Sequence, residues 1–180
     1  MNLKYIKIFN VFGVFLLSFL AHFMYSLFPC ILISFFFPVN ESIWEHMKIL
    51  FTSTLLYGII DYFLLKFYSI KFQNFAFQLF ITCFFSVIIY LVLYLPVYYF
   101  FGENLFFSIF LMFLVYTGSS IISYKLLTSP ENIYLNYIAT PLIIMCYIMF
   151  IIFTYKPPHN FLFYDTLNNH YGIKNIYYRN

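Results

Sequence analysis

The sequence predicts an all-α integral membrane protein, a bundle of about five transmembrane helices. Of its 180 residues, 64% are hydrophobic and only 8% are charged, whereas a soluble domain averages about 25% charged residues. A disordered chain is poor in aromatic residues, but this chain contains 28 Phe and 19 Tyr. Its apolar runs are continuous and do not alternate with polar residues, so a membrane β-barrel is a poor alternative.

The first predicted helix covers residues 8–28 and follows two lysines near the N-terminus. A spanning helix needs about 20 mostly apolar residues, and this run supplies them. We expect the helix to be retained, because cleavage of a signal peptide after Ala21 would require a small residue where Phe19 stands. Residues 30–37 are apolar but too few to cross again, so they lie at the interface or dip into the membrane.

Four more helices are predicted from the remaining long intervals with few charges. The second helix, residues 42–65, is the least apolar, because it has ionisable side chains near its start and Asp61 near its end. The other three cover residues 75–98, 105–124 and 133–155. No internal repeat or linker marks a second domain. Residues 1–155 therefore form one transmembrane domain, and residues 156–180 form an aromatic C-terminal tail.

The positive residues predict the orientation of this bundle. In a five-helix arrangement, most lysines close to helix ends lie on the side of the N-terminus, and such an excess marks the cytoplasmic side. That side holds Lys4, Lys7, Lys66, Lys71 and Lys125, whereas the other holds Lys48 and Lys156 near helix ends. We therefore expect a multi-pass protein of the cell membrane with a cytoplasmic N-terminus and an external C-terminus.

Charge and cysteine content also limit the partners. The nine Lys and Arg residues are dispersed and the net charge is only +3, so no basic surface for nucleic acid is expected. The lipid bilayer is the expected surrounding, and a homo-oligomer or a membrane partner is left open. Cys30, Cys83 and Cys146 lack the spacing of a zinc site or a disulfide framework.

The most polar segment lies at the start of the second helix. Its ionisable residues are Glu41, Glu45, His46 and Lys48. In a structural interpretation, Ser42 and Glu45 form a helix capping box, Trp44 anchors the helix in the headgroup layer, and Lys48 pairs with Glu45. In a functional interpretation, the segment is a cation-binding or acid–base site, because ionisable groups at membrane depth are costly and are kept for a function.

The tail supplies further polar side chains on the same side of the membrane. An even number of crossings separates it from the second helix start, and His22 points toward this side. Imidazole together with carboxylate is typical of a divalent transition-metal site. The candidate metal ligands are His22, Glu45, His46 and His159, and the candidate catalytic residues are Glu41, Glu45, His46 and Asp165. Alternatively, Pro157 and Pro158 end the last helix and the tail, including His170, lies solvated on the interface.

Two blocks of this sequence resemble a family of small multi-pass bacterial membrane proteins of unknown function. The first block, N-E-S-x-W-E-H-x-K, is formed by Asn40, Glu41, Ser42, Trp44, Glu45, His46 and Lys48. The second, P-P-H-x-x-L-F-x-D followed by Y-G-I, is formed by Pro157, Pro158, His159, Leu162, Phe163 and Asp165, then Tyr171, Gly172 and Ile173. The resemblance implies an integral membrane protein and brings no established activity.

Three kinds of function remain open from the sequence. The first is a membrane enzyme or cation-binding protein with an outward-facing site, for which a divalent metal is the expected cofactor. The second is a small transporter or channel subunit, with Asp61, Asn136 and residues 117–120 along a path. The third is a non-catalytic accessory or immunity-type membrane component. If Asp61 is structural, we expect neutralisation by a cytoplasmic lysine, namely Lys66, Lys71 or Lys125.

Overall fold

The computed structural model describes residues 2–173 of the chain. Within these residues the chain forms six α-helices and one small sheet of two strands. Five of the helices are long and apolar enough to cross a membrane, which confirms the predicted all-α membrane bundle. These five are α1 (Leu3–Leu27), α3 (Ile43–Phe67), α4 (Phe75–Phe101), α5 (Leu105–Thr128) and α6 (Ile133–Tyr155).

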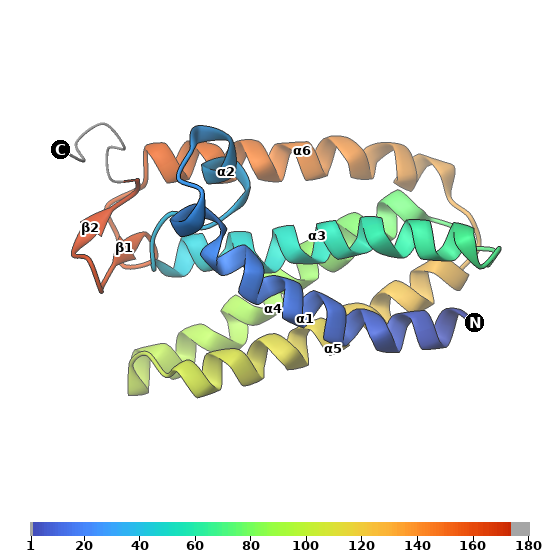
Figure 1. The fold of residues 1–180 in the computed structure, drawn as a ribbon, viewed down its shortest axis with the longest axis horizontal. Helices are drawn as coiled ribbons and strands as arrows, with labels where there is room; N and C mark the ends of the chain where they lie inside the picture. Colours follow the sequence, from blue (N-terminus) through green and yellow to red (C-terminus); the bar gives the residue numbers. More distant parts are fainter. Residues whose placement is uncertain (1, 174–180) are drawn as a thin grey trace.

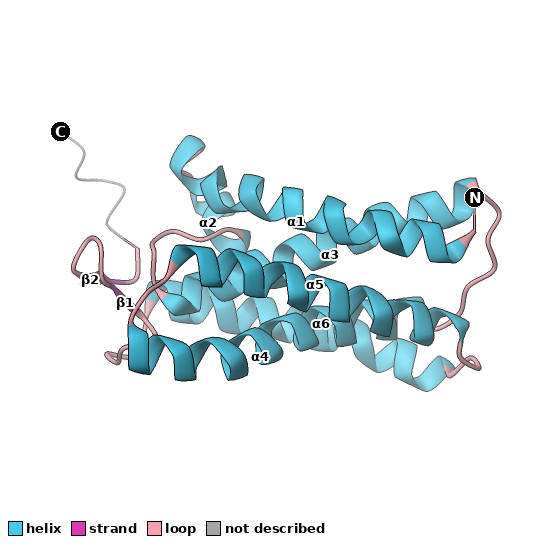
Figure 2. Ribbon diagram, turned by 90° about the horizontal axis from the view of Figure 1, so that it is seen from below, coloured by secondary structure: helices cyan, strands magenta, loops and turns pink. Residues whose placement is uncertain are grey.

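The five long helices run side by side along the long dimension of the molecule (Figures 1 and 2). α3 packs against α1 and α4, while α4 also contacts α5 and α6, and α5 returns to contact α1. The bundle therefore has two ends. We call them the Glu41 end, where α3 begins and the tail lies, and the Lys66 end, where α1 begins and α3 ends.

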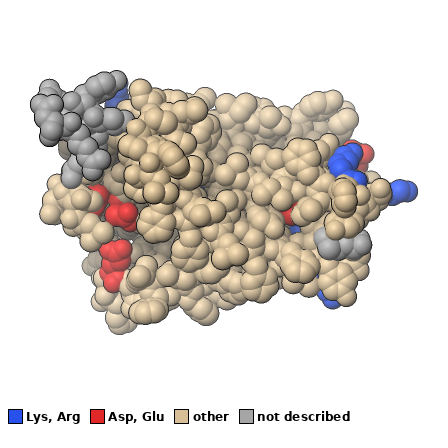
Figure 3. All heavy atoms as spheres, viewed as in Figure 1, with Lys and Arg blue, Asp and Glu red and all other residues tan. Residues whose placement is uncertain are grey.

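The outer surface of the bundle is apolar along its length. Large side chains such as Phe9, Phe12 and Leu20 of α1 and Phe110 of α5 are more than half exposed. Figure 3 shows the charged side chains mainly at the two ends, with an uncharged belt between them. Contact of this belt with lipid tails costs no hydrophobic free energy, whereas contact with water would. The surface thus agrees with a multi-pass membrane protein.

The observed helices differ from the predicted ranges mainly at their ends. α1 begins at Leu3 instead of near residue 8, because the Asn2 side chain accepts a capping hydrogen bond from the Tyr5 amide at 3.2 Å. Lys7 does not interrupt this helix, since its ammonium is buried in an ion pair with Asp61 at 2.6 Å. α4 and α5 also continue past their predicted ends. The predicted ranges of α1 and α5 were limited by lysines, but a lysine need not end a helix. α1 includes Lys4 and Lys7, and α5 continues through Lys125.

The apolar segment after α1 forms α2 (Ile31–Phe36), which is too short to cross and lies against α6. The Lys48 ammonium donates hydrogen bonds to the carbonyl oxygens of Ser34 at 2.9 Å and Phe37 at 3.3 Å. The Ser34 hydroxyl is also 2.8 Å from the Tyr155 hydroxyl. These contacts hold the middle and the C-terminal end of the short helix against the bundle at the Glu41 end.

The described part of the tail folds back over the start of α3. β1 (Tyr164–Asp165) pairs antiparallel with β2 (His170–Tyr171). The Trp44 amide donates to the Leu162 carbonyl at 2.8 Å. The tail and the beginning of α3, more than a hundred positions apart in sequence, therefore form one unit. The last part of the predicted tail, residues 174–180, lies outside the described residues.

Candidate metal site

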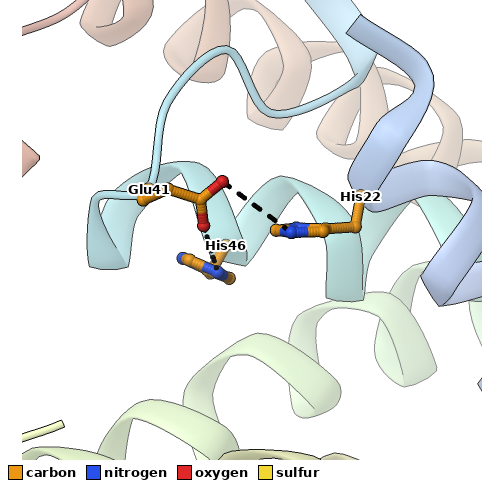
Figure 4. A group of neighbouring side chains, drawn as sticks. All are labelled: His22, Glu41 and His46. Atoms are coloured by element: carbon orange, nitrogen blue, oxygen red, sulfur yellow. Dashed lines mark ion pairs between the residues drawn. The ribbon is translucent and has the colours of Figure 1, made fainter. Parts of the chain in front are cut away.

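Two histidines and one carboxylate meet at the Glu41 end of the bundle. His22 comes from the last turns of α1, Glu41 from the loop before α3, and His46 from the first turn of α3. The Nε2 atom of His22 is 3.7 Å from Glu41 Oε1, and that of His46 is 3.5 Å from Glu41 Oε2. Figure 4 shows both imidazoles directed toward this carboxylate. All three ligand atoms lie within 4.8 Å of one another.

The beginning of α3 orients His46. Ser42 is the N-cap residue, and its hydroxyl accepts a hydrogen bond from the Glu45 amide at 3.3 Å. The Nδ1 atom of His46 is 2.9 Å from the Ser42 carbonyl oxygen. A carbonyl only accepts, so Nδ1 is the donor in this contact, and in the neutral ring the Nε2 atom that faces Glu41 carries the lone pair. Metal-binding histidines are commonly fixed by such a hydrogen bond from the second ring nitrogen.

The tail positions Glu41. The Glu41 amide donates to the Asp165 carboxylate at 3.3 Å. On the other side of the loop, the Asn40 side chain donates to the Gly172 carbonyl at 2.8 Å and accepts from the Ser42 amide at 2.9 Å. The backbone around Glu41 is thus held on both sides, while its side chain stays free to face the two histidines.

Asp165 of the tail is fully buried and joins the tail to the loop that contains Glu41. It accepts hydrogen bonds from the Leu167 and Asn168 amides and from the Asn168 side chain. Burial by itself raises the pKa of the Asp165 carboxyl, but the hydrogen bonds from Asn168 and neighbouring backbone amides outweigh it, so its pKa lies below the ordinary value. The carboxylate is therefore ionised at neutral pH and is used to hold the tail and Glu41.

The spacing of the cluster is close to that of a metal site. Zinc binds imidazole nitrogen and carboxylate oxygen at about 2.1 Å, so neighbouring ligand atoms in a tetrahedral site are about 3.4 Å apart. The two histidine-to-glutamate distances, 3.5 and 3.7 Å, are within a few tenths of this value. The His22 and His46 rings also stack at 5.6 Å with an angle of 25°. Small side-chain shifts would let all three bind one ion.

Glu45, a candidate ligand from the sequence, lies elsewhere. Its carboxylate is buried and forms an ion pair with Lys48 at 2.7 Å. It also accepts hydrogen bonds from the Thr154 hydroxyl at 2.7 Å and from the Val39 amide at 3.1 Å. The pair with Lys48 agrees with the structural interpretation of Glu45, but the capping box is only half formed, because the Ser42 amide donates to Asn40 and not to Glu45. The Glu45 contacts join α3 to α6 and to the loop after α2.

The histidines of the tail also lie apart from the cluster. The His159 ring stacks on Tyr171, with ring centres 4.6 Å apart. His170 is near Asp165, with Nε2 3.9 Å from the carboxylate. Within residues 2–173, the group of side chains close enough to share a metal ion is His22, Glu41 and His46.

Asp61 has a different partner from the expected cytoplasmic lysines. Lys7 of α1 pairs with it at 2.6 Å, and the Asn10 side chain donates to the same oxygen at 2.8 Å. The expectation of Lys66, Lys71 or Lys125 was therefore wrong, because sequence alone does not reveal which helix faces α3. Lys66 instead lies over the rings of Tyr62 and Phe72.

The other residues proposed for a transport path are also used inside the bundle. The Asn136 side chain accepts a hydrogen bond from the Phe77 amide at 3.1 Å. The Thr117 hydroxyl donates to the Phe113 carbonyl, and the Ser120 hydroxyl donates to the Lys7 carbonyl at 2.6 Å. These hydrogen bonds join neighbouring helices or stay within one helix, so they account for Asn136, Thr117 and Ser120 as packing contacts. The Ser119 hydroxyl is buried without a hydrogen-bond partner among the described residues.

A cavity of about 390 Å³ adjoins the His22, Glu41 and His46 cluster. It lies between α1, α3, α4 and α5 at the Glu41 end, and Tyr164 and Thr166 of the tail also contribute. Three tyrosines of α4, spaced four residues apart, line its wall: Tyr90, Tyr94 and Tyr98. Sequence reasoning missed this wall, although the spacing itself places the three rings on one helical face.

These observations define a class: a multi-pass membrane protein with a partly exposed histidine–glutamate cluster beside a cavity at one end of its bundle. The chain belongs to the family described as "Family of unknown function (DUF6512)", whose model matches residues 2–173. The match includes the tail as well as the helices. No curated protein and no solved structure matches the chain.

Proposed function

We propose that this protein binds a divalent transition metal, with zinc as the best fit, through His22, Glu41 and His46 at the external boundary of the cell membrane. The single observation that carries the proposal is the convergence of these three ligand atoms within 4.8 Å from three separate parts of the chain. Nitrogen and oxygen ligands of this kind suit zinc and its neighbours better than magnesium or calcium.

The accessibility of the cluster supports a site that works on another molecule. The side chains of His22, Glu41 and His46 are 27%, 34% and 30% exposed, so they are reachable without unfolding. Three protein ligands would leave one position of a tetrahedral ion open, as in catalytic zinc sites, and all three ligand residues line the adjoining cavity. A metal bound there supplies a Lewis acid that polarises an oxygen of a ligand or of water.

The protein side chains have separate tasks in this proposal. His46 offers Nε2 because its Nδ1 proton is held by the Ser42 carbonyl. Glu41 supplies negative charge between two imidazoles, and Asp165 keeps the Glu41 backbone in place. The same distances would also be expected if the histidines were protonated and formed ion pairs with Glu41 without a metal. Metal analysis distinguishes these two explanations.

The proposal is tested by measuring bound metal in the purified full-length protein. We expect about one equivalent of zinc after loading and dialysis, and loss of most of it in His46→Ala and in Glu41→Gln. His159→Ala is the matched control, because this histidine is at the same end of the molecule but stacks on Tyr171. Absence of stoichiometric metal, or equal losses in the control, would contradict the proposal.

A further inference from the structure

The cavity beside the cluster has the size of a ligand site. Its volume of about 390 Å³ is within the usual range of small-molecule pockets, about 300–1,000 Å³. One part of its wall is polar and contains the cluster, Ser108 and Glu103. The remaining wall is mainly apolar and aromatic, with Phe19, Ile49, Ile109 and Met112 among its residues. A matching ligand has a polar head and an apolar body.

The cavity also reaches the surface that faces lipid. Phe19 and Phe23 of α1 and Leu105 of α5 line it, yet they are 40%, 53% and 68% exposed. The same side chains thus belong both to the cavity wall and to the apolar outside of the bundle. In a membrane, a ligand would enter between α1 and α5 from the lipid leaflet.

Charge at the Glu41 end selects among lipids. The cavity is lined by two carboxylates, Glu41 and Glu103, and no Lys or Arg is among its described lining residues. Lys156 at this end lies outside the lining, and Lys48 is paired with Glu45. This excess of negative charge disfavours a purely anionic headgroup and favours one that carries a positive group. A metal ion at the cluster would attract a phosphate oxygen into its open position. A headgroup with both phosphate and ammonium would match the proposed metal ion and the Glu103 carboxylate at the same time.

We propose that the cavity binds an aminophospholipid of the phosphatidylethanolamine type. Its phosphate faces the metal at His22, Glu41 and His46, its ammonium faces Glu103, and one acyl chain lies against Ile109 and Met112. This inference rests on the proposed metal site and adds the class of its ligand. The tyrosine hydroxyls of the α4 wall are hydrogen-bond donors for the remaining headgroup oxygens.

Native mass spectrometry of the zinc-loaded, full-length protein in detergent tests this binding. Phosphatidylethanolamine and phosphatidylglycerol with identical acyl chains are added separately, and the lipid-bound fraction is measured. Ile109→Trp fills the cavity and should lower phosphatidylethanolamine binding by about tenfold or more. Ile121→Trp, on the lipid-facing side of the same helix, is the matched control and should bind as the wild type does.

A second variant tests the headgroup. Glu103 is exposed, so Glu103→Gln should fold normally, and we expect it to lower the preference for phosphatidylethanolamine over phosphatidylglycerol about fivefold. Chelation of the metal should weaken binding of both lipids. Equal lipid binding by Ile109→Trp and Ile121→Trp, or an unchanged preference in Glu103→Gln, would overturn the inference.

Metal content measured on the same samples separates the two proposals. If the wild type contains zinc but shows no lipid preference, the lipid inference fails and the metal site stands. If no zinc is bound, the metal proposal itself has failed, whatever lipid is retained.

Discussion

At the scale of single residues, the position of Glu41 depends on a glycine far away in the sequence. Gly172 has a positive φ of 64°, and its carbonyl accepts the hydrogen bond from Asn40. A Cβ atom at this position would lie 2.8 Å from the Thr154 carbonyl oxygen and 3.1 Å from Pro157. Glycine is thus required twice, for its backbone conformation and for the close approach of two chain segments.

Gly172→Ala should therefore destabilise the protein more than its conformation alone explains. We expect a loss of about 2 kcal/mol or more, from a positive φ and from the clash with backbone. Gly102→Ala measures the backbone cost alone, because its φ of 73° and ψ of −165° disfavour any Cβ atom but nothing lies within 4 Å of the added atom. It should lose about 1–3 kcal/mol, and less than Gly172→Ala. Thermal unfolding in detergent measures both, and equal shifts would contradict the proposed close approach.

The ionisable residues around the start of α3 have different contacts although they are neighbours in sequence. Glu45 and Lys48 point into the bundle and neutralise each other, and removing one would leave a buried charge unpaired. Glu41 and His46 remain partly exposed and face His22. The structural interpretation therefore accounts for the Glu45–Lys48 pair, and the functional interpretation stays a proposal for Glu41 and His46.

At the scale of elements, the tail and the first turn of α3 are joined by aromatic packing. The Trp44 ring contacts Phe163 of the tail at 4.9 Å between ring centres, and Phe150 and Phe153 of α6 at 5.3 and 5.2 Å. Phe163 is only 7% exposed. This packing explains why a short hairpin, which would be marginal alone, keeps its place at the end of a helical bundle.

Trp44 is the only tryptophan in the chain, so its fluorescence reports tail docking directly. We expect Phe163→Ala to shift its emission to longer wavelength and to cost about 3 kcal/mol, because the indole ring loses its cover and a cavity forms. Phe161→Ala should change neither, since Phe161 is 59% exposed. An unchanged spectrum in Phe163→Ala would show that the tail is not held by this contact.

At the scale of the whole molecule, the bundle distributes its charges unequally between its two ends. Among the described residues, the Lys66 end holds Lys4, Lys66, Lys71 and Lys125 beside one carboxylate, Glu131, whereas the Glu41 end holds Glu41, Glu103 and Asp165 beside Lys156 and the Glu45–Lys48 pair. Figure 3 shows blue atoms mainly at the Lys66 end and red atoms mainly at the Glu41 end of one face. Since positive residues favour the cytoplasm, the proposed orientation puts the cluster of His22, Glu41 and His46 outside.

Cysteine labelling of intact cells measures this orientation. In a variant without the native cysteines, Asn160→Cys should react with a membrane-impermeant maleimide, because residue 160 is exposed at the Glu41 end. Glu131→Cys, exposed at the Lys66 end, is the paired control and should react only after permeabilisation. The reverse pattern would contradict the proposed orientation.

The sequence by itself determined the fold class, because a spanning helix requires a length of apolar residues that is readable without any neighbour. It also indicated the ionisable residues at the start of α3 and in the tail. The i,i+3 spacing within one helix also predicted the Glu45–Lys48 pair. Only the tertiary structure decided the groupings between distant segments: Glu41 faces His22 and His46, and Asp61 faces Lys7. The physical reason is that helix pairing in a membrane depends on side-chain packing between distant segments, which hydrophobic length does not encode.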